Sequence, residues 1–223
     1  MDLLKRLAAH LPADWQWNMR RRRYARQIRN NTFRTSEPEY DRLADWLHPG
    51  DWAIDIGANI GHYTKRMSEL VGPKGRVIAF EPIPTTFALL ASNARYFAHD
   101  NVTLFNAAIS DKTALCGMDI PKFSTGLANY YEAELTPSDQ ADTSVLSLSL
   151  DAFTFPSRIA LIKIDAENHE YPVLQGMRAL LLRDHPILIV ETGQQSVMDF
   201  LSSIDYSMLR LPNSPNILFV QKA

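Results

Sequence analysis

The chain has 223 residues, of which 46% are hydrophobic, and its formal net charge is -2. This length suits one domain with a substantial core, and the near balance of charge argues against a disordered chain and gives no overall reason to expect a nucleic-acid partner. A single cysteine, Cys116, excludes a disulfide framework and a cysteine-based zinc site, and no apolar run approaches the roughly 20 residues that span a bilayer, so we expect a cytoplasmic protein.

We interpret residues 1–35 as an N-terminal arm and residues 36–223 as the main domain. Apolar residues recur at helical spacing over residues 3–11, and six arginines follow within residues 20–29. A basic amphipathic segment can lie on an anionic membrane surface. The alternative is that the arm packs on the domain or pairs the subunits of a homodimer.

The main domain opens with an expected helix, followed by a regular alternation. Ser36 and Glu39 have the spacing of a capping box, which predicts a helix that ends near residues 48–50. After it, short apolar runs alternate with segments of helical periodicity. We predict core strands at residues 52–56, 77–80, 102–105, 159–164 and 187–190. This alternation predicts βαβ units and a parallel sheet.

Residues 111–158 interrupt the alternation, and we interpret them as an insertion on the substrate side of the domain. Within them, residues 143–150 alternate in part as a strand would. A single helix with an apolar face through residues 173–181 is predicted after the fourth core strand. The chain closes with two runs, residues 206–211 and 217–220, which predict an antiparallel hairpin at the edge of the sheet.

The loop after the first strand contains two glycines, Gly57 and Gly61. Gly57 would let the backbone turn sharply and approach a ligand, and the start of the next helix offers amide groups to an anion. A dinucleotide fingerprint would have glycine in place of Asn59; the observed pattern is associated with an amino-acid-bearing nucleoside cofactor. The second strand ends at Glu81, 24 residues after Gly57. A carboxylate there can accept hydrogen bonds from both ribose hydroxyls of a nucleoside.

Ionisable residues gather after the fourth core strand. Asp165 falls at the edge where α/β sheets bind ligands, and Glu167, His169 and a second glutamate follow it closely. Pro172 fits only the first turn of a helix, so His169 lies near a helix start. Glu191 ends the fifth strand in the same way. The plain alternative is that these polar residues cap the helix and face solvent.

These blocks resemble the FkbM-type methyltransferase family over about residues 36–222. The matching segments are residues 55–64, 81–82, 106–111, 161–170 and 173–176. Asn168 stands where the family usually has glycine, but asparagine tolerates left-handed backbone. The resemblance implies a class I methyltransferase fold, which is a Rossmann-like, mainly parallel seven-stranded sheet with a C-terminal antiparallel hairpin. It also implies S-adenosylmethionine as methyl donor and a hydroxyl acceptor on a sugar, glycan or secondary metabolite.

The resemblance also implies a role for each matching position. The methionine part of the cofactor would lie beside Asp55, Gly57, Ala58, Asn59 and Gly61. Glu81 would hold the ribose, and Asn106 and Ala107 would flank the adenine. Asp165 would lie both against the cofactor and near the methyl-transfer centre.

An alcohol acceptor has to lose its proton, so a general base helps. We interpret His169 as that base, with Asp165 positioning the acceptor or the imidazole. Asp165 itself and Glu191 are the other candidates for the base, and His62 is a weaker one. Asp165, Glu191 and either Glu167 or His169 would suit Mg²⁺, although a metal-free site is favoured. The rival functions are an NAD-dependent oxidoreductase and a catalytically silent cofactor-binding partner subunit.

Overall fold

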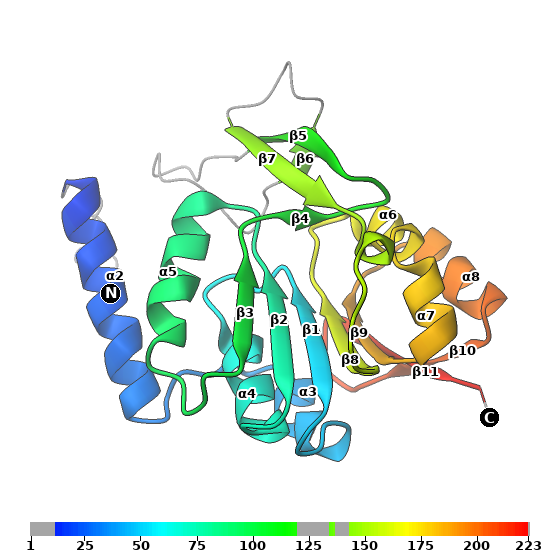
Figure 1. Ribbon diagram of the computed structural model, residues 1–223, viewed down its shortest axis with the longest axis horizontal. Coiled ribbons are helices and arrows are strands. Elements are labelled where there is room, and N and C mark those ends of the chain that lie inside the picture. Colours follow the sequence, from blue (N-terminus) through cyan, green and yellow to red (C-terminus); the bar gives the residue numbers. More distant parts are fainter. Residues whose placement is uncertain (1–11, 120–133, 137–142, 223) are drawn as a thin grey trace.

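A seven-stranded sheet forms the centre of the structure (Figure 1). The computed structural model describes residues 12–119, 134–136 and 143–222, so residues 1–11 of the predicted arm and parts of the predicted insertion lie outside it. The central strands are β1 (Trp52–Ile56), β2 (Arg76–Phe80), β3 (Val102–Phe105), β8 (Ile159–Ile164), β9 (Ile187–Glu191), β10 (Tyr206–Arg210) and β11 (Asn216–Gln221). Their order is β10-β11-β9-β8-β1-β2-β3. The sheet is parallel from β9 to β3, as predicted, and β11 runs antiparallel to both of its neighbours.

Helices cover both faces of this sheet, which explains why its strands are continuous apolar runs. The helices are α2 (Ala13–Arg29), α3 (Pro38–Arg42), the 3-10 turn η1 (Leu43–Asp45), α4 (His62–Val71), α5 (Pro84–Ala94), the 3-10 turn η3 (Leu150–Ala152), α6 (Glu170–Gln175), α7 (Arg178–Asp184) and α8 (Gln195–Ser203). Ile54 and Ile162 pack toward α6, α7 and α8. Ala53 and Leu161 pack toward α3 and α4 on the opposite face.

A second, smaller sheet lies across one end of the first (Figure 1). Its strands are β4 (Ala108–Ile109), β5 (Ala114–Asp119), β6 (Glu134–Thr136) and β7 (Thr143–Leu148), in the order β4-β7-β5-β6. Ile109 and Met118 of this sheet line a cavity together with Ile56 and Phe80, the last residues of β1 and β2. The second sheet therefore covers the carboxyl ends of the parallel strands.

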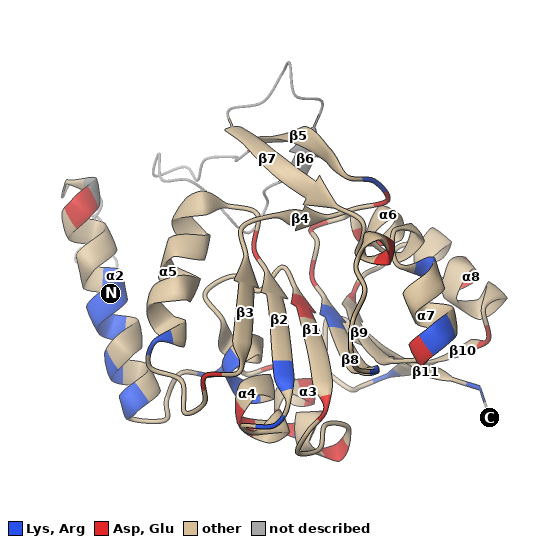
Figure 2. Cartoon of the chain, in the orientation of Figure 1, with Lys and Arg blue, Asp and Glu red and all other residues tan. Residues whose placement is uncertain are grey.

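Helix α2 packs against α5 through its apolar side, with Ala25 and Ile28 buried. The Arg29 guanidinium lies 4.8 Å from the centre of the Tyr96 ring. Most of the arginines of α2 face outward and form a basic band along the helix (Figure 2). Among the helices that the structure describes, none is long and apolar enough to cross a membrane.

The capping box predicted from Ser36 and Glu39 is wrong. Within the described part of the chain, no side chain caps the first turn of α3. Glu39 is instead buried, and it accepts hydrogen bonds from Tyr63 Oη at 3.1 Å, from Ser214 Oγ at 2.7 Å and from Asn216 Nδ2. Contacts with the far end of the chain have replaced the local motif.

Two further elements differ from prediction. The single helix expected after β8 is divided into α6 and α7 at Gly176 and Met177. A Cβ on Gly176 would lie 1.9 Å from the carbonyl oxygen of Ser110, so a neighbouring loop presses against this break. The C-terminal hairpin is not wholly at the edge: β10 is the edge strand, whereas β11 lies inside the sheet because it pairs with β9, for example Ile217 with Val190.

Candidate functional site

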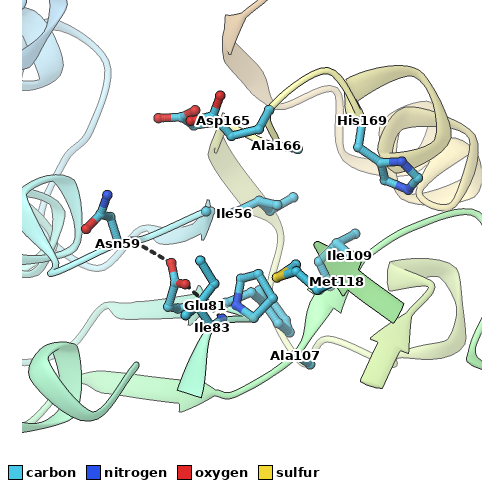
Figure 3. A pocket seen from close by; sticks show the side chains of 15 residues that line it. Ile56, Asn59, Glu81, Ile83, Ala107, Ile109, Met118, Asp165, Ala166 and His169 are labelled. Carbon is cyan, nitrogen blue, oxygen red and sulfur yellow. Dashed lines mark hydrogen bonds between the residues drawn. The ribbon is translucent and has the colours of Figure 1, made fainter. Parts of the chain in front are cut away.

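The carboxyl ends of β1, β2 and β8 meet at one cavity (Figure 3). Its apolar wall consists of Ile56, Phe80, Ile83, Ala107, Ile109 and Met118. Its polar wall consists of Asn59, Glu81, Asp165, Glu167 and His169. The arrangement suits a ligand with a flat apolar part at one end and hydroxyl groups at the other, because small-molecule sites combine apolar surface with a few placed polar groups.

Gly57 allows the loop after β1 to pass directly against the end of β8. Its φ is +76°, and a Cβ there would lie 1.8 Å from the carbonyl oxygen of Asp165, so a larger residue would force the two strand ends apart. The N–H groups of Gly57 and Ala58 donate to Phe80 O at 3.0 and 2.9 Å. Asn59 follows in left-handed backbone, with φ 49°. The loop is therefore fixed on both sides of the cavity.

Glu81 is 4% exposed and its carboxylate is held at the cavity wall by two backbone groups. Asn59 N donates to Oε2 at 2.8 Å, and Ile83 N donates to Oε1 at 3.0 Å (Figure 3). Burial raises the pKa of Glu81 to about 7, although both N–H groups act in the opposite direction. Each carboxylate oxygen keeps acceptor capacity beyond its one N–H partner, so Glu81 can accept hydrogen bonds from a diol.

The remaining residues predicted to bind a cofactor occupy different positions. Ala107 lines the cavity, but the Asn106 side chain donates to the carbonyl oxygens of Glu81 at 2.8 Å and Pro82 at 2.9 Å, which fixes the loop instead. Gly61 is not among the residues that line this cavity: a Cβ there would lie 2.6 Å from Leu90 of α5. Gly61 thus sets the distance between α4 and α5.

A second cavity adjoins the first on the other side of the glycine loop, and Ala58 and Asp55 line it. Asp55 is buried, and it accepts a hydrogen bond of 2.5 Å from Thr64 Oγ1. Burial raises the pKa of Asp55 to about 6, and the Thr64 hydroxyl and the Lys163 ammonium lower it. Lys163 also lines this cavity and was not predicted as a site residue. Its one signal in the sequence is a charge inside the otherwise apolar run of residues 159–164.

The turn after β8 has an unusual backbone. Glu167 and Asn168 are both left-handed, with φ 47° and 71°, so asparagine does adopt the glycine-like conformation that its position predicts. Glu170 is buried and holds this turn, because its Oε1 accepts hydrogen bonds from Ala166 N at 3.3 Å and Asn168 N at 3.1 Å. The turn directs Asp165 and Glu167 into the cavities on both sides of the glycine loop.

His169 lies at the N-cap of α6 and lines the first cavity. Its Nε2 is 2.9 Å from Ser110 Oγ, which in turn donates to Asp111 Oδ1 at 3.0 Å. Burial lowers the pKa of His169, and Asp111 raises it. The Asp165 carboxylate points away from the ring (Figure 3). The imidazole therefore contacts Ser110 and not Asp165, and the other predicted role of Asp165, positioning the acceptor, stays a prediction.

A third, strongly acidic cavity lies where β8 and β9 end, lined by Asp165, Glu167, Glu170 and Glu191 among others. Partial burial raises the pKa of Glu191, and the nearby Asp165 carboxylate raises it further. In the part of the chain that the structure describes, no three histidine, cysteine or acidic side chains are grouped closely enough to hold a metal ion. His62 packs against Phe33, with ring centroids 4.2 Å apart.

Comparison with known proteins relates this chain to methyltransferases. The methyltransferase FkbM domain family matches residues 55–208. The 31-O-demethyl-FK506 methyltransferase FkbM of Streptomyces tacrolimicus is 32% identical over 161 residues, covering 59% of this chain and 61% of that protein. Methyltransferase 1 of Beauveria bassiana is 28% identical over 143 residues, covering 56% and 57%. The matched regions thus span about three fifths of these relatives' own length.

Solved structures share the fold. The methyltransferase FkbM of Methylobacillus flagellatus aligns with 98% of this chain and 60% of its own, with a TM-score of 0.57 and 17% identity. A putative rRNA methylase of Clostridium thermocellum aligns with 81% of this chain and 90% of its own, with a TM-score of 0.53 and 15% identity. Such low identities establish the class I methyltransferase fold alone, and these matches do not favour the oxidoreductase alternative. Because the family's match extends over more than half of the 223 residues, the chain belongs to the methyltransferase FkbM domain family.

Proposed function

We propose that this chain is an S-adenosylmethionine-dependent methyltransferase that methylates a hydroxyl group of a small molecule or glycan. The observation that carries the proposal is the position of the Glu81 carboxylate. It is buried at the end of β2, beside the glycine loop of β1, in one cavity with Asp165 of β8. Family membership and the names of the relatives support the same reaction class.

The residues of the first cavity fit the adenosine part of the cofactor. Glu81 would accept hydrogen bonds from the two ribose hydroxyls, because both of its oxygens are already oriented by backbone N–H groups. Ile83, Ala107 and Met118 form apolar surface beyond it, against which an adenine ring can lie. Recognition of the nucleoside would therefore combine one charged acceptor with apolar packing.

The second cavity fits the positively charged remainder of the cofactor. Asp55, Asp165 and Glu191 contribute carboxylates to its wall. S-adenosylmethionine would supply an electrophilic methyl group on its sulfonium. Carboxylates favour a nearby cation, and the fixed contact between Gly57 and Asp165 brings the ends of β1 and β8 together where the two cavities meet.

We further propose that His169 accepts the proton of the acceptor hydroxyl. Ser110 Oγ donates to Asp111, so the Nε2–H of His169 donates to Ser110 Oγ and Nδ1 is left as the basic nitrogen. Burial lowers the pKa of this imidazole, which keeps it neutral near pH 7 and able to take up a proton. The insertion at residues 111–158 would lie beside both the cofactor and the acceptor, because its β5 contributes Met118 to the same cavity that His169 lines.

Two measurements test the proposal. Calorimetry should detect binding of S-adenosylmethionine and of its product S-adenosylhomocysteine, and no binding of NAD⁺. A screen with a radiolabelled methyl donor over sugars, nucleotide sugars and small phenols should then find an acceptor, with the product hydrolysed to locate the O-methyl group. Binding of NAD⁺ in place of S-adenosylmethionine would reject the reaction class, and label recovered on nitrogen or carbon would reject O-methylation.

A further inference from the structure

Lys163 is a buried cation in the middle of the sheet. It belongs to the central strand β8, is 2% exposed and stands beside Asp55 of β1 in the strand register. Residues of one register pair share a face of the sheet, so both side chains project toward the face that α4 covers, where Tyr63 lies. The Lys163 ammonium is 5.3 Å from the centre of the Tyr63 ring. An apolar residue would be expected at this place in a core strand.

The polar contacts of this ammonium are long. Its Nζ lies 3.5 Å from Ile164 O and 3.5 Å from Asp165 Oδ2. Good N–H···O hydrogen bonds measure about 2.7–3.2 Å, and a lysine has three donors to satisfy. A buried charge is costly unless it is both paired and hydrogen-bonded. The geometry thus leaves Lys163 with the capacity for a closer anionic partner.

The surroundings indicate what that partner is. Lys163 lines the second cavity, whose wall carries many carboxylates, among them Asp55, Asp165 and Glu191. The other strongly basic residue of that wall, Arg34, is exposed and bound by Asp41 at 2.6 Å. An amino-acid group has one anionic end and one cationic end. The carboxylates can receive the cationic end, and Lys163 is the interior group suited to the anionic end.

We propose that Lys163 binds the α-carboxylate of the methionine part of S-adenosylmethionine. The inference rests on the proposed function, since it requires that cofactor. The start of α4 at His62 lies along the same wall and adds backbone N–H groups that favour an anion. In the bound state the carboxylate replaces the long contacts of the ammonium with a close ion pair, and Asp165 remains available to the reacting end of the cofactor.

The test compares two ligands on three proteins by calorimetry. The ligands are S-adenosylmethionine and decarboxylated S-adenosylmethionine, which keeps the adenosine, the sulfonium and the amine and lacks only the carboxylate. The proteins are wild type, Lys163→Met and Lys65→Met. Lys65 is a matched control, because it is also buried but is paired with Glu69 at 2.5 Å and lines none of the three cavities.

Wild type and Lys65→Met should bind S-adenosylmethionine about tenfold to a hundredfold more tightly than the decarboxylated ligand, as expected for a charged hydrogen bond. Lys163→Met should lose most of this preference, because only the backbone N–H groups at the start of α4 are then left to bind the carboxylate. The Asp165 side chain is 36% exposed, so water can solvate it once the lysine is gone.

Each other outcome overturns the inference. If Lys163→Met discriminates between the ligands as wild type does, or if it weakens both equally, the lysine does not bind the carboxylate. If Lys163→Met fails to fold, equal affinity of wild type for the two ligands still overturns the inference, because no group of the protein would then recognise the carboxylate. Failure of wild type to bind either ligand would instead reject the proposed function itself.

Discussion

The Glu81 carboxylate predicts how cofactor affinity depends on pH. Burial raises its pKa to about 7, so close to neutral pH only part of the ligand-free protein carries it ionised. Hydrogen bonds from ribose hydroxyls favour the ionised form and lower this pKa in the complex. Binding should therefore release a proton, and the affinity for S-adenosylmethionine should rise with pH through the region of that pKa.

The size of the effect follows from the ionised fraction of Glu81. With a pKa of about 7, this fraction is roughly nine tenths at pH 8 and roughly one tenth at pH 6. The cofactor should bind about tenfold more weakly at pH 6 than at pH 8. Asp55, with its pKa raised to about 6, adds a further factor of about two at pH 6 if the cofactor prefers its ionised form.

Calorimetry in two buffers of different ionisation enthalpy measures both the affinity and the number of protons released. Glu81→Gln is the matched variant, because it keeps the shape of the side chain and removes its titration. At pH 8 it should bind about tenfold to a hundredfold more weakly than wild type, and its affinity should change little between pH 6 and pH 8. A flat wild-type profile, or a variant with the wild-type pH dependence, would show that Glu81 does not contact the ribose.

Three further predictions concern the same site. The folded-state pKa of Glu81, about 7, exceeds its ordinary 4.5, so its contribution to the stability of the ligand-free protein is full below about pH 4.5 and is lost as pH rises through 7. Urea denaturation should show a smaller decline in Glu81→Gln than in wild type, because only groups such as Asp55, whose pKa is also raised, still contribute to it. Gly57→Ala should lower the free energy of unfolding by at least about 2 kcal/mol, because its φ is +76° and its Cβ would lie 1.8 Å from the carbonyl oxygen of Asp165. Gly193→Ala is the control: no atom of the described residues lies within 4 Å of a Cβ placed there, so the free energy of unfolding should change by less than about 1 kcal/mol. His169→Ala should reduce kcat at least about a hundredfold with cofactor affinity kept within a few-fold, and Ser110→Ala should cost less; steady-state kinetics with normal turnover by His169→Ala would place the base elsewhere.

The core strands could be predicted from the sequence because they are buried on both faces. A strand covered by helices on each side is a continuous apolar run, and the predicted bounds of β1, β3 and β8 agree with the structure residue for residue. The glycine loop and Glu81 were equally predictable, since strand ends of a parallel sheet meet at one edge. The local sequence pattern was therefore sufficient to place the core strands and the residues at their carboxyl ends.

The wrong predictions concern elements whose structure depends on contacts between residues far apart in the sequence. Glu39 forms no capping box because Ser214 and Asn216 bind it instead. Gly176 divides the predicted helix because a loop carrying Ser110 packs onto it, which no periodicity reveals. The alternation of the last strands does not say which of them is inserted next to β9. Lys163 was not predicted as a site residue, because its role can be inferred only once its neighbours across the sheet, such as Asp55, and the cavity that it lines are known.

The hydrogen bond between Glu39 and Ser214 has a consequence for folding during synthesis, because it cannot form until nearly the whole chain has been made. The two residues are 175 positions apart, so at roughly 5–20 residues per second the ribosome makes the second about 9–35 s after the first. Until then the carboxylate lacks the hydrogen bonds from Ser214 and Asn216, and burying it with part of its acceptor capacity unused is costly. Tyr63, which donates to the same carboxylate, lines the second cavity. The packing behind this wall of the second cavity is thus completed only when β11 joins the sheet.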